Sequence, residues 1–312
     1  MDSMKSFSYI LTIAASGSIS EAAESLGIAQ SALSRYLMKV EKDIGIEIFD
    51  RSTLPLSLTE AGSYYVEAGK QILKLGRQLE KRIADINNHK NLEIRIGTGP
   101  SRSPTLMPLI LSEFSSLYPD VHVLMEECRS SELAERLKDG KLDLIISFLD
   151  QDTANFDMVE LFQETVELAV PQNYQQLVDD CMQDGLVDVR KLCAPFISLH
   201  EGQQLRNALD ILSRGIIKPL YTCEYQESVM TLVGHGFGVA LVPTYWKQID
   251  ATSKLKYFPL IVPAELNLDE INRLMSVIHR RIGIFYRKEQ YLTDAERSYI
   301  ASAKRVCKLF NE

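Results

Sequence analysis

The sequence predicts an N-terminal all-α winged helix-turn-helix with a long linker helix, followed by a C-terminal α/β domain. Short helix-period patterns occupy residues 5–44, and one long apolar seam follows over residues 59–87. From residue 92 onward, apolar strand patterns alternate with helix patterns, which is typical of parallel sheets covered by helices.

The composition is that of an ordinary soluble globular protein. The 312 residues are enough for two or three domains, and 46% of them are hydrophobic while 24% are charged. No apolar run approaches the ~20 residues that span a bilayer, and the start lacks the pattern of a secretory signal. The five cysteines are scattered without metal-ligand spacing. We therefore expect a cytoplasmic protein with reduced thiols and no metal site.

The net charge of −8 does not exclude nucleic acid as a partner. Residues 1–90 contain as many basic as acidic side chains, so the acidity lies in the rest of the chain. A neutral N-terminal region can bind DNA where its cations gather on one face.

Two short helices are predicted at the start of the chain. The first covers residues 5–16 and ends at Gly17, and the second is capped by Ser20 and ends at Gly27, which can adopt positive φ. Small alanines let the two helices cross closely, as a helix-turn-helix requires. The predicted core positions are Phe7, Ile10, Leu11, Ala14, Ala22, Ala23 and Leu26.

A third helix, predicted over residues 30–44, buries Leu33, Leu37 and Val40 and carries polar side chains on its opposite face. Gln can read adenine and Arg can read guanine or bind phosphate. Ser can contact either a base or a phosphate. Strand patterns around residue 55 predict a β-wing. The candidate DNA-binding residues are Gln30, Ser31, Ser34, Arg35, Tyr36, Lys39 and, at the base of the wing, Arg51. The alternatives are a solvated cation at Arg35 and a partly exposed structural tyrosine at Tyr36.

A long helix capped by Thr59 is predicted to continue to about residue 87. Its apolar seam is Tyr65, Ala68, Ile72, Leu75, Leu79 and Ile86, interrupted at Arg82. A narrow seam of this kind favours pairing with a second copy of the chain, although packing on its own domain is the alternative. Two recognition helices related by a twofold axis would read a pseudo-palindromic operator. The polar residues 87–91 predict a domain boundary.

The first 62 residues resemble the LysR-type transcriptional regulator family. The matching positions are Phe7, Gly17-Ser18, Ala22-Ala23, Leu26, Gln30, Ala32 to Arg35, Glu41, Gly45, Phe49, Arg51, Leu58-Thr59 and Ala61-Gly62. This resemblance implies double-stranded DNA as partner, with Gln30, Ser31, Ser34 and Arg35 in the major groove and Arg51 at the flanking backbone or minor groove. It also implies a homodimer or homotetramer, with RNA polymerase as a further partner.

Two features of the sequence depart from the family pattern, one at a single position and one along the wing. Ala29 stands where the family often has Ser or Thr, and such a missing cap costs about 1 kcal/mol. The wing residues 52–57 include no basic side chain, which predicts fewer phosphate contacts and a shallower salt dependence.

The remaining chain resembles the two-lobed, periplasmic-binding-protein-like effector domain of the same family. The supporting segments are residues 106–108, 114, 118–119, 137–146 and 236–243. Strands are predicted over 92–97, 121–125, 142–148, 195–199, 220–225 and 239–243, and helices over 104–117, 131–138, 205–213, 228–235 and 293–309, with residues 164–171 between the two sets. The predicted domains are residues 1–59, 60–90 and 91–312, and the resemblance implies one lobe from 91–163 plus 268–312 and a second from 164–267.

A small-molecule site is predicted between the lobes, because open α/β sheets bind ligands beyond the carboxyl ends of their strands, often at helix N-termini. The candidate effector-binding residues are Ser101, Arg102, Ser103, Ser130, Phe148, Ser198, His200, Gln203 and Ser228. Hydroxyls, backbone N–H groups and Arg102 suggest an anionic effector. The alternatives are capping serines without a ligand, a surface arginine and an ordinary strand-end histidine.

The sequence does not support an enzymatic function. It has no G-x-S-x-G, no Walker loop and no H-E-x-x-H, so we expect neither catalysis nor a cofactor. Two rivals to the regulator are a solute-binding protein and a redox sensor that uses Cys181 and Cys193.

Overall fold

The computed structural model describes residues 3–53, 55–87, 92–148, 153–249, 254–288 and 290–310. The chain divides into two compact units, Met1–Leu92 and Glu93–Glu312, which are described separately here. Within the predicted boundary at 87–91, residues 88–91 lie outside the described part, as does Leu54 of the wing. In the described residues, no helix combines the length and apolar character needed to cross a membrane.

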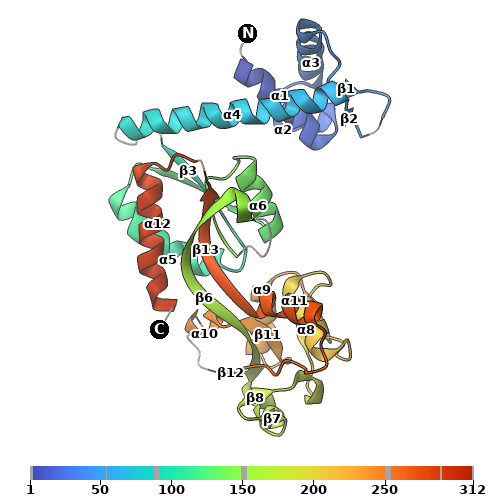
Figure 1. Ribbon diagram of the computed structural model, residues 1–312, viewed down its shortest axis with the longest axis vertical. Helices are drawn as coiled ribbons and strands as arrows, with labels where there is room; N and C mark the ends of the chain where they lie inside the picture. Colours follow the sequence, from blue (N-terminus) through green and yellow to red (C-terminus); the bar gives the residue numbers. More distant parts are fainter. Residues whose placement is uncertain are drawn as a thin grey trace. The chain divides into compact units, whose positions relative to one another are not determined.

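The first unit consists of four helices and a two-stranded wing (Figure 1). Its strands pair antiparallel, with Phe49 opposite Leu58. The elements are α1 Ser3–Ser16, α2 Ile19–Ser25, α3 Gln30–Ile44, β1 Phe49–Asp50, β2 Ser57–Leu58 and α4 Glu60–Ile86. The third predicted helix therefore has the predicted bounds.

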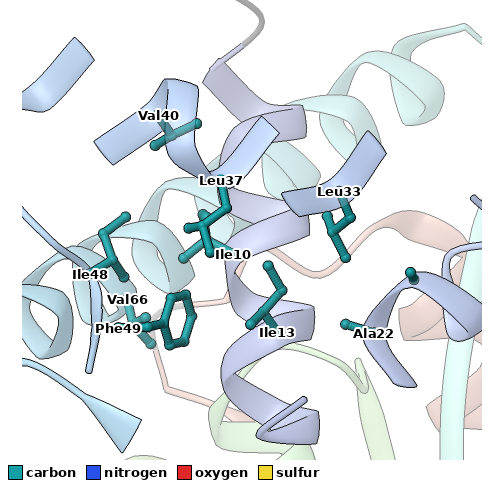
Figure 2. Packing of buried hydrophobic residues seen from close by; sticks show 10 residues of the cluster. Ile10, Ile13, Ala22, Leu33, Leu37, Val40, Ile48, Phe49 and Val66 are labelled. Carbon is teal, nitrogen blue, oxygen red and sulfur yellow. The ribbon is translucent and has the colours of Figure 1, made fainter. Parts of the chain in front are cut away.

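The core of this unit takes side chains from every helix and from the wing (Figure 2). Ile10 and Ile13 of α1 face Leu33 and Leu37 of α3, and all four are at most 1% exposed. The predicted stripe omitted Ile13. The reason is that α1 is covered on two sides, because Phe7 packs its ring 5.1 Å from that of Tyr65 in α4.

Three details of this unit depend on single residues. Ser18, rather than the predicted Ser20, caps α2, since its side chain accepts the Glu21 N–H. Gly27 adopts φ +64° and so ends α2 as predicted. At the start of α4, a Cβ on Gly62 would lie 1.9 Å from the Ile48 carbonyl oxygen, so only glycine lets α4 approach the wing this closely.

The second unit is built on a seven-stranded sheet in the order β11-β6-β13-β5-β3-β4, with β12 also paired to β6. Its strands are β3 Glu93–Thr98, β4 His122–Glu127, β5 Leu144–Ser147, β6 Phe156–Pro171, β11 Ala240–Pro243, β12 Leu255–Phe258 and β13 His279–Arg287. β3 pairs in parallel with β4 and β5, as the sequence pattern predicted. Two smaller sheets pair β9 Ile197–Leu199 with β10 Tyr221–Cys223 and β7 Met182–Gln183 with β8 Leu186–Val187.

Helices cover these sheets. They are α5 Ser103–Leu117, α6 Ser130–Lys138, α7 Gln175–Asp179, α8 Gln204–Ser213, α9 Gln226–Gly234, α10 Tyr245–Ile249, α11 Leu268–Ile278 and α12 Asp294–Cys307. Short 3₁₀ turns occupy Thr153–Asn155, Gln172–Tyr174, Val189–Lys191 and Lys308–Phe310. A capping box of Thr293 and Glu296 begins α12, where the closing helix was predicted.

Two long antiparallel strands, β6 and β13, run from one lobe into the other (Figure 1). The first part of β6 pairs with β13, and its last residues pair with β11 and β12. The sequence placed residues 164–171, the last part of β6, between two sets of strands and helices without assigning them a structure, and it predicted neither α11 nor β13. The start of β13 was not predicted because it has three successive polar residues, His279-Arg280-Arg281. Such a run does not match the apolar or alternating pattern expected of a buried strand. These residues lie where the two strands cross between the lobes.

Candidate functional site

The polar face of α3 is open to solvent in the described structure. Gln30, Ser31, Arg35 and Lys39 are exposed and Ser34 is partly buried. The opposite face is closed, since Leu33 and Leu37 are at most 1% exposed. An amphipathic helix with this exposed face has the form of a major-groove recognition helix.

Arg35 lies along the first turns of its own helix. Its Nε donates a hydrogen bond of 3.1 Å to the Ser31 carbonyl oxygen. Ala29, at the N-cap, provides no side-chain acceptor for the first N–H groups of α3. Such N–H groups at a helix N-terminus are suited to a phosphate oxygen.

Tyr36 differs from its neighbours because its polar atom faces the interior of the unit. Its hydroxyl lies 2.8 Å from Ser6 Oγ, and its ring meets that of Tyr9 edge-on at 5.1 Å. These contacts connect α3 to α1. The Tyr36 side chain thus has packing contacts of its own, and its predicted contact with DNA stays a prediction.

Arg51 is held at the base of the wing by Glu41. Its Nη2 lies 2.7 Å from Glu41 Oε2, while Oε1 of the same carboxylate accepts the Ile48 N–H at 2.9 Å. Glu41 is buried and Arg51 is half exposed. The Glu41 carboxylate thus connects the last turns of α3 to the base of the wing. The sequence offered Glu41 only as a matching position, with no role.

Helix α4 has two different halves. Near its start it packs on α1, where a Cβ added to Gly69 would lie 2.7 Å from the ring of Phe7. Further along, large apolar side chains are exposed: Leu75 at 65%, Leu79 at 59%, Ile83 at 50% and Ile86 at 80%. The first half of α4 therefore packs on its own domain, whereas pairing of the exposed second half with another copy stays a prediction.

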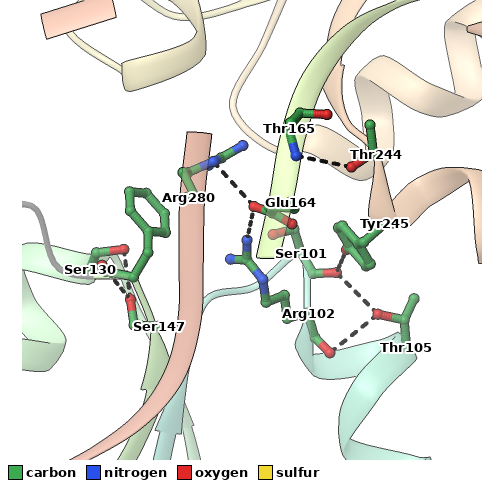
Figure 3. A network of polar contacts seen from close by, with 11 residues as sticks. Ser101, Arg102, Thr105, Ser130, Ser147, Glu164, Thr165, Thr244, Tyr245 and Arg280 are labelled. Atoms are coloured by element: carbon green, nitrogen blue, oxygen red, sulfur yellow. Dashed lines mark hydrogen bonds and ion pairs between the residues drawn. The ribbon is translucent and has the colours of Figure 1, made fainter. Parts of the chain in front are cut away.

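In the second unit, Arg102 is buried rather than on the surface (Figure 3). Its Nη2 lies 2.5 Å from Glu164 Oε1, and Arg280 Nε lies 3.1 Å from the same oxygen. The three side chains are at most 6% exposed. The surface arginine considered from the sequence is therefore wrong, and the carboxylate that Arg102 binds belongs to β6 of the same chain.

Two aromatic rings close this buried ion cluster. The Phe148 ring centroid lies 4.8 Å from Arg280 Cζ and 5.8 Å from Arg102 Cζ, so the predicted mouth residue packs on the cations. Tyr245 lies 5.6 Å from Arg102 Cζ and donates a hydrogen bond of 2.6 Å to the Ser101 carbonyl oxygen. Burial raises the pKa of Tyr245 to about 12, although the positive charge of Arg102 opposes this shift. Sequence reasoning missed Glu164, Arg280 and Tyr245, because nothing local shows that they meet.

The other predicted effector residues form separate groups. Ser147 Oγ donates to Ser130 Oγ at 3.1 Å within the first lobe (Figure 3). His200 Nε2 lies 3.8 Å from Glu224 Oε2, and Gln203 Nε2 donates to the Glu224 carbonyl oxygen at 3.1 Å. The described strand β9 contains Ser198, which is 6% exposed.

One contact bridges the lobes near these residues. Arg129, which precedes α6, places its Nη2 2.5 Å from Glu224 Oε1. Both side chains are largely exposed, so this ion pair contributes little to stability by itself. It nevertheless links the first lobe to the group around His200.

A cavity of about 790 Å³ lies between the lobes. Its first-lobe wall is Pro100, Ser103, Pro104, Met107, Pro108, Leu111, Met125 and Glu127, and its second-lobe wall is Tyr225, Glu227 and Ser228. It includes Ser103 and Ser228 but none of the other seven predicted effector residues. The predicted set is therefore spread over several places rather than gathered in one.

Thiol or metal chemistry has little support in the described residues. No group of three or more His, Cys, Asp or Glu side chains is arranged there to hold a metal ion. Cys181 donates to the Lys191 carbonyl oxygen at 3.1 Å, and burial raises the pKa of its thiol, with the nearby Cys193 a smaller cause. A raised pKa disfavours the reactive thiolate.

Comparisons with known families agree with both units. Residues 4–63 match the family described as bacterial regulatory helix-turn-helix protein, lysR family. Residues 87–308 match the LysR substrate binding domain.

Individual relatives cover most of the chain. The transcriptional regulator YcgK of Bacillus subtilis is 28% identical over 77% of this chain and 79% of its own length. The DNA-binding transcriptional dual regulator OxyR of Escherichia coli is 23% identical over 91% of this chain and 89% of its own length. Both relatives are named as regulators of transcription rather than as enzymes.

Solved structures share the fold at lower identity. A full-length OxyR variant from Pseudomonas aeruginosa superimposes with a TM-score of 0.63 at 21% identity, over 98% of this chain and 94% of that one. Full-length CbnR in complex with its target DNA superimposes with a TM-score of 0.58 at 18% identity, over 97% of this chain and 99% of that chain. The exposed polar face of α3, the two-lobed α/β unit and these matches together show that the chain belongs to the LysR family of DNA-binding transcriptional regulators.

Proposed function

We propose that the chain acts as a homo-oligomer whose α3 helices read a pseudo-palindromic operator, under the control of a small anionic effector bound between the lobes. The observation that carries the DNA part is the solvent-exposed polar face of Gln30, Ser31, Arg35 and Lys39 on a helix whose other face is buried. A regulator bound beside a promoter would also meet RNA polymerase, and its site of action would be the cytoplasm.

Pairing through the second half of α4 supports the homo-oligomer. Leu75, Leu79 and Ile83 recur at intervals of four along the exposed side, and each is at least half exposed. Exposed apolar rows on a long helix favour association with a second such helix. This pairing would place two recognition helices about a twofold axis.

Effector control is supported by the way the loop before α5 contacts the hinge, the region where β6 and β13 cross between the lobes. Arg102 of this loop binds Glu164 on β6, and Ser101 accepts a hydrogen bond from Tyr245 of α10. A ligand that touched Ser101 or Ser103 would therefore act on contacts between the lobes. It would shift lobe closure only by binding one arrangement better than the other. The α5 N-terminus in the same loop favours an anionic group.

The test of the DNA part is selection of bound fragments from the source genome, followed by titration of the enriched sequence. We expect a pseudo-palindrome, and we expect Arg35→Ala to weaken its binding by at least about 1 kcal/mol. Lys304→Ala, which removes an exposed cation from α12, is the matched control and should leave operator affinity unchanged. Equal affinities for Arg35→Ala and the parent protein would contradict the assignment of α3.

A further inference from the structure

The cavity between the lobes has an acidic character that an anionic effector alone does not explain. Two carboxylates line it, Glu127 at the end of β4 and Glu227 in the first turn of α9. None of its lining residues is Lys, Arg or His. A purely anionic ligand would meet two like charges here without a side-chain cation to offset them.

These two carboxylates have no basic partner in the described part of the chain. Arg129 is bound to Glu224, and Arg102 is bound to Glu164. Glu227 Oε1 is buried and accepts no hydrogen bond from the described residues. Because Glu227 is only partly buried and lines the cavity, a ligand N–H group in the cavity would pair with this carboxylate, which has no ion pair of its own in the described residues.

The same cavity offers a place for a negative group. Ser103 lines it, is 5% exposed, and its hydroxyl has no hydrogen bond within the residues that the structure describes. It is the first residue of α5, a helix of 15 residues, so its hydroxyl lies beside the positive end of the helix. An unused donor at a helix N-terminus suits a carboxylate.

The remaining wall is apolar and aromatic. Met107, Leu111 and Met125 line it on the first lobe, and Tyr225 faces it from the second. Thioethers and leucine accommodate an aliphatic chain, and the tyrosine ring can lie against an ammonium group.

We propose that the cavity binds a zwitterion with an apolar body. Its ammonium group would lie at Glu127 and Glu227, its carboxylate at Ser103 and the α5 N-terminus, and its aliphatic part along Met107, Leu111 and Met125. The inference rests on the proposed function only in taking this ligand as the effector: its carboxylate is the anionic group proposed for the α5 N-terminus, and its ammonium group is the part that the proposed function does not include. The binding itself does not depend on DNA recognition.

Three probes with matched six-carbon chains test the proposal on the full-length protein: L-norleucine, hexanoate and n-hexylamine. Binding is followed by the fluorescence of Trp246, the single tryptophan, which is 9% exposed and next to Tyr245, and by the midpoint of thermal unfolding. We expect norleucine to raise the midpoint most, since it carries both the ammonium and the carboxylate group, whereas each of the other probes carries one of them.

Charge-removing variants identify the end that binds the ammonium group. Glu227→Gln should weaken norleucine and hexylamine binding by about tenfold or more, whereas hexanoate binding should stay the same or become tighter because a like charge is removed. Glu127→Gln provides the same test. Glu127 is exposed at the end of β4, so this substitution should affect folding less than Glu227→Gln. Glu135→Gln on α6 is the control, because Glu135 is exposed and does not line the cavity.

Three outcomes would overturn the proposal: no response to norleucine, hexanoate binding as tightly as norleucine, or unchanged norleucine affinity in both Gln variants. Operator binding of the parent protein is measured separately. A protein that binds norleucine but no operator would refute the proposed function and leave this inference standing, whereas operator binding without norleucine binding would do the reverse.

Discussion

The Tyr245 hydroxyl donates a hydrogen bond of 2.6 Å to the carbonyl oxygen of Ser101, across 144 residues of sequence. This bond joins α10 of the second lobe to the loop that begins α5 in the first. Arg102, the next residue of that loop, binds Glu164 where β6 crosses between the lobes. The loop that carries three predicted effector residues is thus attached to both the second lobe and the hinge.

Replacing Tyr245 with Phe should lower the free energy of unfolding by about 1 kcal/mol, because the Ser101 carbonyl loses a buried donor. The measurement is urea denaturation of the full chain. Tyr225→Phe serves as the control, since Tyr225 is 53% exposed and its hydroxyl should matter little. Equal losses in the two variants would contradict a specific role for the Tyr245 hydrogen bond.

Tyr245 also predicts a loss of stability at alkaline pH. Burial raises its pKa from 10.0 to about 12 in the folded protein, against the opposing effect of Arg102. Because the folded pKa is raised, this stabilisation is fully present below the unfolded pKa of 10.0 and is lost between that value and about 12. Denaturation midpoints measured from neutral pH to about pH 11 should fall more steeply for the parent than for Tyr245→Phe. Parallel pH curves would exclude Tyr245 as a source of the decline.

Glu164→Gln should destabilise the second unit by about 3–5 kcal/mol, because it removes the carboxylate that two buried arginines share. Glu160→Gln is the matched control on the same strand. Glu160 faces Arg281 at 3.9 Å with both side chains exposed, so its loss should cost less than about 1 kcal/mol. Thermal unfolding of both variants gives the comparison, and a Glu164→Gln variant as stable as the control would refute the ion cluster's role.

Gly62→Ala should destabilise the helix-turn-helix by about 1–3 kcal/mol or more, since the added Cβ would lie 1.9 Å from the Ile48 carbonyl oxygen. Gly99→Ala is its counterpart, because a Cβ there meets no atom within 4 Å. Circular dichroism during thermal unfolding measures both. If Gly62→Ala were neutral, α4 could not approach the wing as closely as described.

Leu79→Glu should weaken self-association without unfolding the chain. The Leu79 side chain is 59% exposed on α4, so its replacement removes apolar surface available to a second copy but little of the unit's own core. Sedimentation measured over a range of protein concentrations reports the change. Val66→Glu would be the contrasting variant, because Val66 is 8% exposed and its replacement should unfold the unit instead. An unchanged oligomer in Leu79→Glu would exclude this half of α4 as the interface.

The helix-turn-helix was predictable because its determinants are local. Gly27 and Gly45 take positive φ as turn residues, and Leu33, Leu37 and Val40 follow the helical period, so short-range geometry decides α3. The same reasoning missed Ile13, whose burial depends on α1 being covered from two sides. It also assigned the α2 cap to Ser20, although Ser18 is placed one turn from the Glu21 N–H.

Periodicity and turn residues, both local properties, allowed the sequence by itself to determine the fold class, the recognition helix and most strands of the parallel sheet. The tertiary structure alone decided which polar residues meet. Arg102, Glu164, Arg280 and Tyr245 come from four separated elements, and burial together with the crossing of β6 and β13 brings them together. Likewise, only packing set Glu127 and Glu227 on opposite walls of one cavity, because no local pattern encodes contacts between residues this distant in sequence.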